Sequence, residues 1–245
     1  MSNQNYTRII KNEIPDVEFH QNTYARQLEQ IVDGNVRWLD IGAGTRVHDG
    51  YGIATPSELA SACSELVGID FEEEHLRRNP DLTSFVVGGA EGLPFPDQRF
   101  ELVTANMVLE HLEQPLKVFQ EVSRVLSAGG VFVFITPNLN HPIIRTISAI
   151  MRPQTQRLVT HKFEGRSLDH IFPTFYRANT TRSITALAAE SDLSIERLEV
   201  VRNIPFITKP AFATWLECQT IKLTKYGALS GFAADIIGVL RKKSL

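Results

Sequence analysis

The sequence predicts an α/β fold built on a doubly wound, mostly parallel sheet. Short apolar segments alternate with amphipathic stretches of helical period from residue 36 to residue 135, which is typical of successive βαβ units. The segment Val131 to Ile135 is nearly all apolar, as expected of a central parallel strand covered on both faces. Two further strands, 193–201 and 233–240, follow later in the chain and would complete a sheet of seven.

The individual elements follow from periodicity and from helix-boundary signals. Thr55, Pro56 and Glu58 have the spacing of a capping box with proline in the first helical position, so a helix is expected to begin there. The final strand is expected to be antiparallel and to pair with the strand before it at the sheet edge, giving a Rossmann-like sheet. We expect strands over 36–41, 66–70, 83–87, 100–105, 131–135, 193–201 and 233–240, and helices over 19–32, 56–64, 72–78, 116–126 and 180–191.

Length and composition suit a single domain, 1–245, with a packed core. The chain has 245 residues, 43% of them hydrophobic and 22% charged, and a net charge of −3. This charge does not favour a nucleic-acid partner, and no apolar run approaches the roughly 18 residues of an integral membrane segment. Cys63 and Cys218 lie far apart without metal-ligand spacing, which predicts a reducing, cytoplasmic setting.

The first expected strand ends in an acid and breaks at glycines, in the run Asp40-Ile41-Gly42-Ala43-Gly44. A turn of this kind is often only a turn, but in an open α/β sheet ligands bind outside the carboxyl ends of the strands. The second strand also ends in an acid, Asp70, and Gly89-Ala90-Glu91 follows the third. An acid after the second strand can accept both ribose hydroxyl protons, so these strand ends suit an adenosine group.

A dinucleotide site would share those features, but its glycine fingerprint fails here. The third glycine of that fingerprint would fall at position 47, which is Val47. Residues 45–54 also separate the glycines from the next helix, so the tight strand-turn-helix geometry that binds a pyrophosphate is not expected.

Several motifs in consistent order resemble class I S-adenosylmethionine-dependent methyltransferases, in particular the small-molecule subgroup that is similar to ubiquinone-biosynthesis methyltransferases. The resemblance covers about residues 36–138. Its motifs are Leu39-Asp40-Ile41-Gly42-Ala43-Gly44-Thr45, Gly68-Ile69-Asp70, Ala90-Glu91-Gly92-Leu93-Pro94-Phe95, Phe100-Glu101-Leu102-Val103, Val108-Leu109-Glu110-His111-Leu112 and Val125-Leu126-Ser127-Ala128-Gly129-Gly130, ending in Thr136-Pro137-Asn138.

The resemblance implies S-adenosyl-L-methionine as cofactor, with its methionine end at the first turn, its ribose at Asp70 and its adenine beside Ala90 and Glu91. It implies these cofactor-binding residues: Asp40, Gly42, Ala43, Gly44, Asp70, Phe71, Ala90, Glu91, Asn106 and Met107. Two positions depart from the pattern. Arg46 stands where the family often has a third glycine, and Gly89 stands where it often has an acid.

The methyl group of a sulfonium is already electrophilic, so its transfer needs mainly in-line positioning, with a general base if the acceptor is a hydroxyl. His111, His170 and Tyr176 are the predicted catalytic residues, and His141 and His161 are weaker candidates for the same role. No metal is expected, because Asn106 is not an acid. The less regular segments 139–178 and 202–230 are expected to form the acceptor site or a cap.

We therefore predict methyl transfer to a small-molecule, lipid-linked or glycan-linked acceptor. One alternative is a methyltransferase-like binding or scaffold protein without turnover, to which Arg46 and Gly89 give some weight. A nicotinamide-dependent oxidoreductase is a second alternative, disfavoured by Val47. The acceptor, the atom that is methylated and the oligomeric state stay open.

Overall fold

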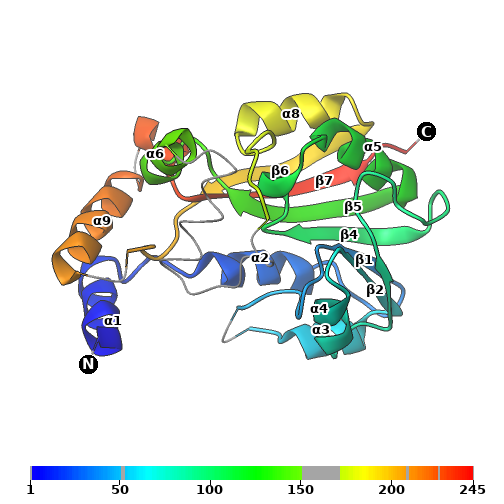
Figure 1. Cartoon of the computed structure of the whole chain (residues 1–245), viewed down its shortest axis with the longest axis horizontal. Coiled ribbons are helices and arrows are strands. Elements are labelled where there is room, and N and C mark those ends of the chain that lie inside the picture. Colours follow the sequence, from blue (N-terminus) through cyan, green and yellow to red (C-terminus); the bar gives the residue numbers. More distant parts are fainter. Residues whose placement is uncertain (1, 51–52, 151–171, 208–209, 226, 245) are drawn as a thin grey trace.

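The computed structural model describes residues 2–50, 53–150, 172–207, 210–225 and 227–244 (Figure 1). Its centre is a seven-stranded sheet in the order β3-β2-β1-β4-β5-β7-β6. The strands are β1 (Arg37–Ile41), β2 (Glu65–Asp70), β3 (Ser84–Val87), β4 (Phe100–Asn106), β5 (Leu126–Pro137), β6 (Leu193–Val201) and β7 (Asp235–Lys242).

The strand pairing confirms the predicted fold class. Strands β1 to β5 pair in parallel, while β7 runs antiparallel to both β5 and β6. The expected pairing of the last two strands is therefore present, with β6 at the edge and β7 inserted between β6 and β5. The order reverses on either side of β1 and β4, and ligands of open α/β sheets bind at such a switch point.

Helices cover both faces of this sheet, as a doubly wound fold requires. Helices α5 and α8 lie on one face, and α2, α3 and α4 lie on the other (Figure 1). The described helices are α1 (Ser2–Glu13), α2 (His20–Glu29), α3 (Pro56–Ala62), α4 (Glu73–Arg78), α5 (Pro115–Val125), α6 (Pro142–Ile150), α8 (Thr181–Ala189) and α9 (Ala211–Leu223), with 3₁₀ turns η1 (Leu109–His111) and η3 (Gly227–Phe232).

Helix α3 begins where the sequence predicted. The backbone N–H of Glu58 donates to the Thr55 hydroxyl at 3.2 Å, and the Thr55 N–H donates to the Glu58 carboxylate at 2.7 Å. Pro56 occupies the first helical position, where its missing N–H costs no hydrogen bond. The capping box thus ends the long loop that follows β1.

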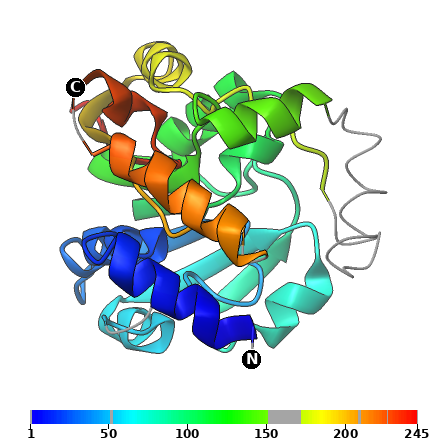
Figure 2. The ribbon, with the colours of Figure 1, turned by 90° about the vertical axis from the view of Figure 1, so that its left-hand side faces the viewer.

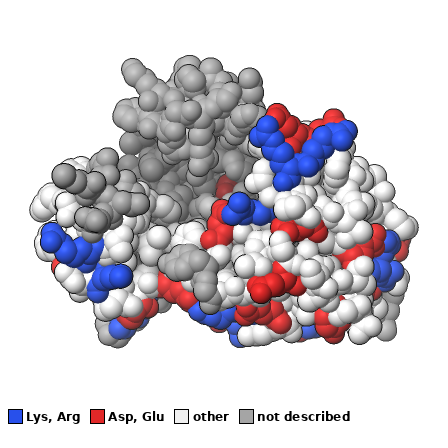
Figure 3. Space-filling model, turned by 90° about the horizontal axis from the view of Figure 1, so that it is seen from below, with Lys and Arg blue, Asp and Glu red and all other residues white. Residues whose placement is uncertain are grey.

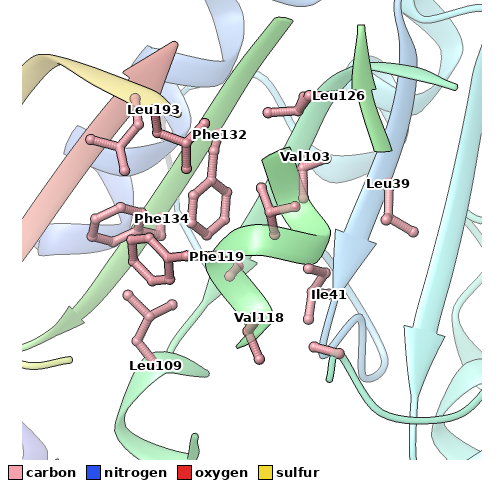
Figure 4. Packing of buried hydrophobic residues seen from close by; sticks show 14 of the residues in the cluster. Leu39, Ile41, Val103, Leu109, Val118, Phe119, Leu126, Phe132, Phe134 and Leu193 are labelled. Carbon is pink, nitrogen blue, oxygen red and sulfur yellow. The ribbon is translucent and has the colours of Figure 1, made fainter. Parts of the chain in front are cut away.

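Two buried apolar clusters fix the sheet between its helices. On the α5 side, Phe119 packs edge-on against Phe132, with ring centroids 5.6 Å apart (Figure 4). On the α2 side, Tyr24, Leu28 and Trp38 are fully buried. Because both faces are closed, the free rim of the sheet at the carboxyl ends of its parallel strands is where polar groups can gather.

The expectation of irregular structure over 202–230 was wrong, because α9 and η3 lie there. Helix α9 packs beside α1 (Figure 2), burying Cys218 and Ile221, while its opposite face exposes Phe212, Trp215 and Leu216. Apolar residues on both faces hide the helical period, which is why the pattern was missed. The polar α1 and the short α6 also went unpredicted.

Acidic and basic side chains are interspersed over the face shown in Figure 3. Within the described ranges, no helix has the length and apolar character needed to cross a bilayer.

Candidate functional site

A cavity of about 430 Å³ opens at the carboxyl ends of β1, β2 and β4. Eight of the residues predicted from sequence line it, namely Gly42, Asp70, Phe71, Ala90, Glu91, Asn106, Met107 and His111. Asp40, Ala43, Gly44 and Tyr176 are not among its lining residues. The sheet therefore brings most of the predicted site together, although those residues are spread along the sequence from Gly42 to His111.

The turn after β1 leaves room only for glycine at its first position. Gly42 has φ of 68°, and a Cβ there would lie 2.5 Å from Cγ2 of Val108. The Gly42 N–H donates to the carbonyl oxygen of Ile69 at 2.8 Å, which binds the turn to the end of β2. The result is a bare backbone wall on the cavity.

Asp70 is held by two backbone amides. The N–H of Gly44 donates to Oδ2 at 3.0 Å, and the N–H of Glu72 donates to Oδ1 at 2.9 Å. Each carboxylate oxygen keeps a further lone pair for a ligand. The side chain is thus oriented to accept two hydroxyl protons, as binding of a ribose requires.

Asp40 lies beneath the cavity rather than on it. It is 2% exposed, and its Oδ1 accepts from the Thr104 hydroxyl at 2.5 Å, while Thr104 accepts from Trp38 Nε1 at 2.7 Å. Burial, and to a smaller extent the charge of Asp70, raise the pKa of Asp40 to about 8 against the lowering effect of the Thr104 hydrogen bond. The predicted contact of Asp40 with the methionine end stays a prediction.

The two departures from the family pattern have local explanations. The Arg46 side chain is 61% exposed and pairs with Asp49 at 3.4 Å, so it does not enter the cavity. At Gly89 a Cβ would lie 2.7 Å from Cζ of Phe71, which itself lines the cavity. The Phe71 ring takes the space in which an acidic side chain at position 89 would begin.

The chain leaves β4 in a constrained turn. Met107 has φ of 57°, a left-handed conformation that is uncommon for residues other than glycine, and its N–H donates to the carbonyl oxygen of Ile135 at 2.9 Å. This turn directs the next residues, Val108 and His111, along the cavity wall.

The tautomer of His111 follows from its contact. Nδ1 lies 3.0 Å from the carbonyl oxygen of Pro173, which can only accept, so Nδ1 carries the proton and Nε2 keeps its lone pair. Glu110 Oε1 lies 4.0 Å from Nε2. Burial raises the pKa of Glu110, the neighbouring His111 lowers it, and Thr136 donates a hydrogen bond to its Oε2 at 3.0 Å.

The other catalytic candidates have different outcomes. Burial and the charge of Glu110 raise the pKa of Tyr176, whose ring lies off the cavity wall. His141 is buried and also absent from the cavity lining, and burial lowers its pKa. His161 and His170 lie outside the described residues. Among the described candidates, His111 is the one that reaches the cavity.

Sequence reasoning missed the polar start of α2, where His20 and Gln21 are buried next to the site. The sequence did carry a signal for these buried polar residues. Gln21, Tyr24 and Leu28 share one helical face, and the last two are core residues, so a glutamine on that face had to find polar partners.

Comparison with known proteins gives a family match for the part of the chain around the cavity. Residues 39–134 match the family model described as a methyltransferase domain. The match covers this part of the chain, which is less than half of its length. Its boundaries enclose the turn after β1, Asp70 and His111, so the resemblance predicted from sequence is confirmed, and with it S-adenosylmethionine as the cofactor of the family.

Relatives of known name match the same region. A demethylmenaquinone methyltransferase of Renibacterium salmoninarum is 36% identical over 111 residues, covering 43% of this chain and 42% of that protein. A malonyl-[acyl-carrier protein] O-methyltransferase of Methylococcus capsulatus is 34% identical over 106 residues, covering 41% and 37% respectively. The chain thus matches less than half the length of these relatives.

Solved structures extend the likeness of fold to most of the chain. A putative methyltransferase from Bacillus halodurans superposes with a TM-score of 0.59 at 17% identity, covering 91% of this chain and all, 100%, of that one. An S-adenosylmethionine-dependent methyltransferase from Mesorhizobium loti gives a TM-score of 0.58 at 19% identity, covering 88% and 96%. At these identities the likeness shows the fold.

Proposed function

We propose that this protein is an S-adenosylmethionine-dependent methyltransferase acting on a small-molecule or lipid-linked acceptor with an ionisable hydroxyl, N–H or activated carbon. The observation that carries the proposal is the arrangement of Gly42, Asp70 and His111 around one cavity at the switch point of the sheet. The relatives act, by their names, on a quinone precursor and on a carrier-linked acid. A glycan-linked acceptor and a cytoplasmic location remain predictions from the sequence.

The residues fit the cofactor on structural grounds. The Gly42 turn offers a surface that a Cβ would close, and Asp70 has a free lone pair on each oxygen. Ala90 and Glu91 line the cavity with Phe71, whose ring would stack on the adenine in place of the missing acid at Gly89. When bound, the cofactor supplies an electrophilic methyl group on its sulfonium.

The protein's own contribution to transfer is orientation, exclusion of water and proton removal. Apolar side chains, among them Met107, Val108, Leu112 and Phe175, line the cavity near His111 and would displace water from it when a ligand binds. His111 Nε2 takes the proton from the molecule that is methylated. It is free to do so because the hydrogen bond to the Pro173 carbonyl keeps the proton of the neutral ring on Nδ1. The carboxyl of Glu110, whose Oε1 lies 4.0 Å from the same Nε2, would stabilise the resulting imidazolium when it is ionised.

The described parts of segments 139–178 and 202–230 supply the cap in this proposal. Helices α6 and α9 come from them and lie beyond one end of the sheet together with α1 (Figure 1). Phe172 and Phe175, from the end of the first segment, line the cavity.

The test is transfer of label from methyl-labelled cofactor into small molecules and lipids of a host extract. Labelled product with the wild-type protein, and none with His111→Ala, supports the proposal. Cofactor binding without any labelled product would instead favour the binding or scaffold protein. A nicotinamide fluorescence titration that saturates, with no binding of S-adenosylmethionine, would favour an oxidoreductase.

A further inference from the structure

The carboxamide of Asn106 can offer a bound ligand only a hydrogen-bond acceptor, its oxygen. Its Nδ2 donates to Gln21 Oε1 at 2.8 Å and to the carbonyl oxygen of Val47 at 2.8 Å, so both N–H groups are used. Its Oδ1 accepts from Gln21 Nε2 at 3.0 Å and keeps a second lone pair. Because Asn106 lines the cavity at the end of β4, that lone pair must meet an N–H or O–H donor of whatever binds there.

The partner amide is equally constrained. Gln21 and Asn106 exchange hydrogen bonds reciprocally, and the second N–H of Gln21 points at His20 Nε2, 3.4 Å away. Gln21 is buried within α2, so water does not compete for these groups. The reciprocal pair also ties the loop after Gly44 to the site, since Val47 accepts from the same Asn106 nitrogen.

His20 fixes the orientation of Gln21. Its Nδ1 lies 2.7 Å from Asp235 Oδ2, and both side chains are buried. Asn203 Nδ2 lies 3.1 Å from the same nitrogen, but the shorter contact with a carboxylate decides that Nδ1 carries the proton. Nε2 is then left with its lone pair, which accepts only the N–H end of Gln21. A chain of contacts thus runs from Asp235 through His20 and Gln21 to Asn106, and each side chain fixes the orientation of the next.

We propose that His20 and Gln21 are positioning residues that hold the Asn106 carboxamide oxygen toward the α-ammonium group of the cofactor's methionine part. The inference rests on the proposed function. Strand β1 pairs with β4 so that Ile41 lies opposite Ala105, which puts Asn106 next to the Gly42 turn where the methionine end is expected. Asp40, the acid of that turn, accepts from the Thr104 hydroxyl and is not among the residues that line the cavity, whereas Asn106 is.

The experiment compares two probes by calorimetry, S-adenosylhomocysteine and its analogue without the α-amino group. The wild-type protein is expected to prefer the amino form. Gln21→Met preserves length and helix propensity but removes both hydrogen bonds between Gln21 and the Asn106 amide, leaving only its bond to Val47. This preference should therefore fall by about tenfold while affinity for the deaminated analogue is unchanged. Gln30→Met, at the exposed C-terminal end of the same helix, is the matched control and should keep the preference.

A second pair of variants addresses the far end of the network. Asp235→Asn retains an oxygen that can accept from His20 Nδ1 and should keep the preference for the amino form, whereas Asp235→Leu should reduce it. Because the readout is a ratio of two affinities in one sample, partial unfolding of a variant does not change it.

Three results would overturn the inference. They are an equal preference in Gln21→Met and wild type, an equal loss of affinity for both probes in Gln21→Met, and equal binding of both probes by the wild type. The last would mean that the Asn106 oxygen does not bind the α-ammonium group. Failure of the wild type to bind either probe would refute the proposed function itself, which distinguishes the two claims.

Discussion

Gly89 and Phe71 share one space: a Cβ on Gly89 would lie 2.7 Å from the Cζ of Phe71. The ring is 66% exposed, lines the cavity and has its centroid 6.4 Å from that of Phe172. The neighbouring strand end thereby explains Gly89, which departs from the family pattern, because the Phe71 ring takes the space in which an acidic side chain at position 89 would begin.

Gly89→Asp should therefore act through Phe71. We expect the substitution to displace the ring and weaken binding of S-adenosylhomocysteine by about fivefold, since aromatic stacking contributes about 1 kcal/mol. Phe71→Ala alone should weaken binding to a similar extent, and the double variant should bind no worse than Phe71→Ala. Calorimetry on the four proteins measures the coupling, and additive losses would contradict the explanation.

His111→Ala should slow methyl transfer without affecting the cofactor. Removal of a positioned general base typically costs about 10² to 10⁴ in rate. Label transfer into the extract would be measured beside the dissociation constant of S-adenosylhomocysteine, with His75→Ala on α4, off the cavity wall, as control. An unchanged rate would remove His111 from the proposed mechanism.

Because the carboxyl of Asp40 is buried, we expect the unfolding free energy of the protein to depend on pH. The carboxyl has a pKa of about 8 in the folded state, against 3.8 as its ordinary value. Between these limits the folded protein retains a proton that the unfolded chain has released, so this group makes stability fall as pH rises. Asp40→Asn carries no such proton. Its unfolding free energy relative to wild type should therefore increase from about pH 5 to about pH 8.

Urea denaturation of both proteins at the two pH values makes this measurement. Other titrating groups cancel in the difference between variant and wild type. A difference that stays constant with pH would show that Asp40 is ionised in the folded protein.

Gly238 tests the packing of the antiparallel strand. It lies opposite Phe134 in the register of β5 and β7, and a Cβ there would lie 2.1 Å from Cζ of that ring. Gly238→Ala should lower the unfolding free energy by about 1–3 kcal/mol through overpacking. Gly34→Ala, where no atom lies within 4 Å of an added Cβ, is the control and should change it little.

The fold could be predicted because its signals are local. The capping box at Thr55 and the apolar run 131–135 each read directly as the element that forms. β5 extends further, over Leu126–Pro137, because its pairing with β7 continues to Pro137 and because Leu126 pairs with Phe100 of β4. Helix α9 was hidden because its apolar residues serve both the contact with α1 and an exposed face.

The site was predictable where strand ends carry it and not where distant segments meet. Asp70 is the last residue of β2 and Ala90 comes shortly after the end of β3, so parallel pairing places them on one rim. The pairing of Gln21 with Asn106, and of His20 with Asp235, joins residues separated by 85 and 215 positions. No local pattern specifies such partners.

The most direct test of the account is a calorimetric titration of the wild-type protein and Asp70→Ala with S-adenosylhomocysteine. Asp70 is the side chain that two backbone amides aim at the cavity. The account predicts saturable binding to the wild type with a dissociation constant on the order of micromolar, and a loss of at least about tenfold in Asp70→Ala. A folded wild-type protein that gives no heat of binding would contradict it.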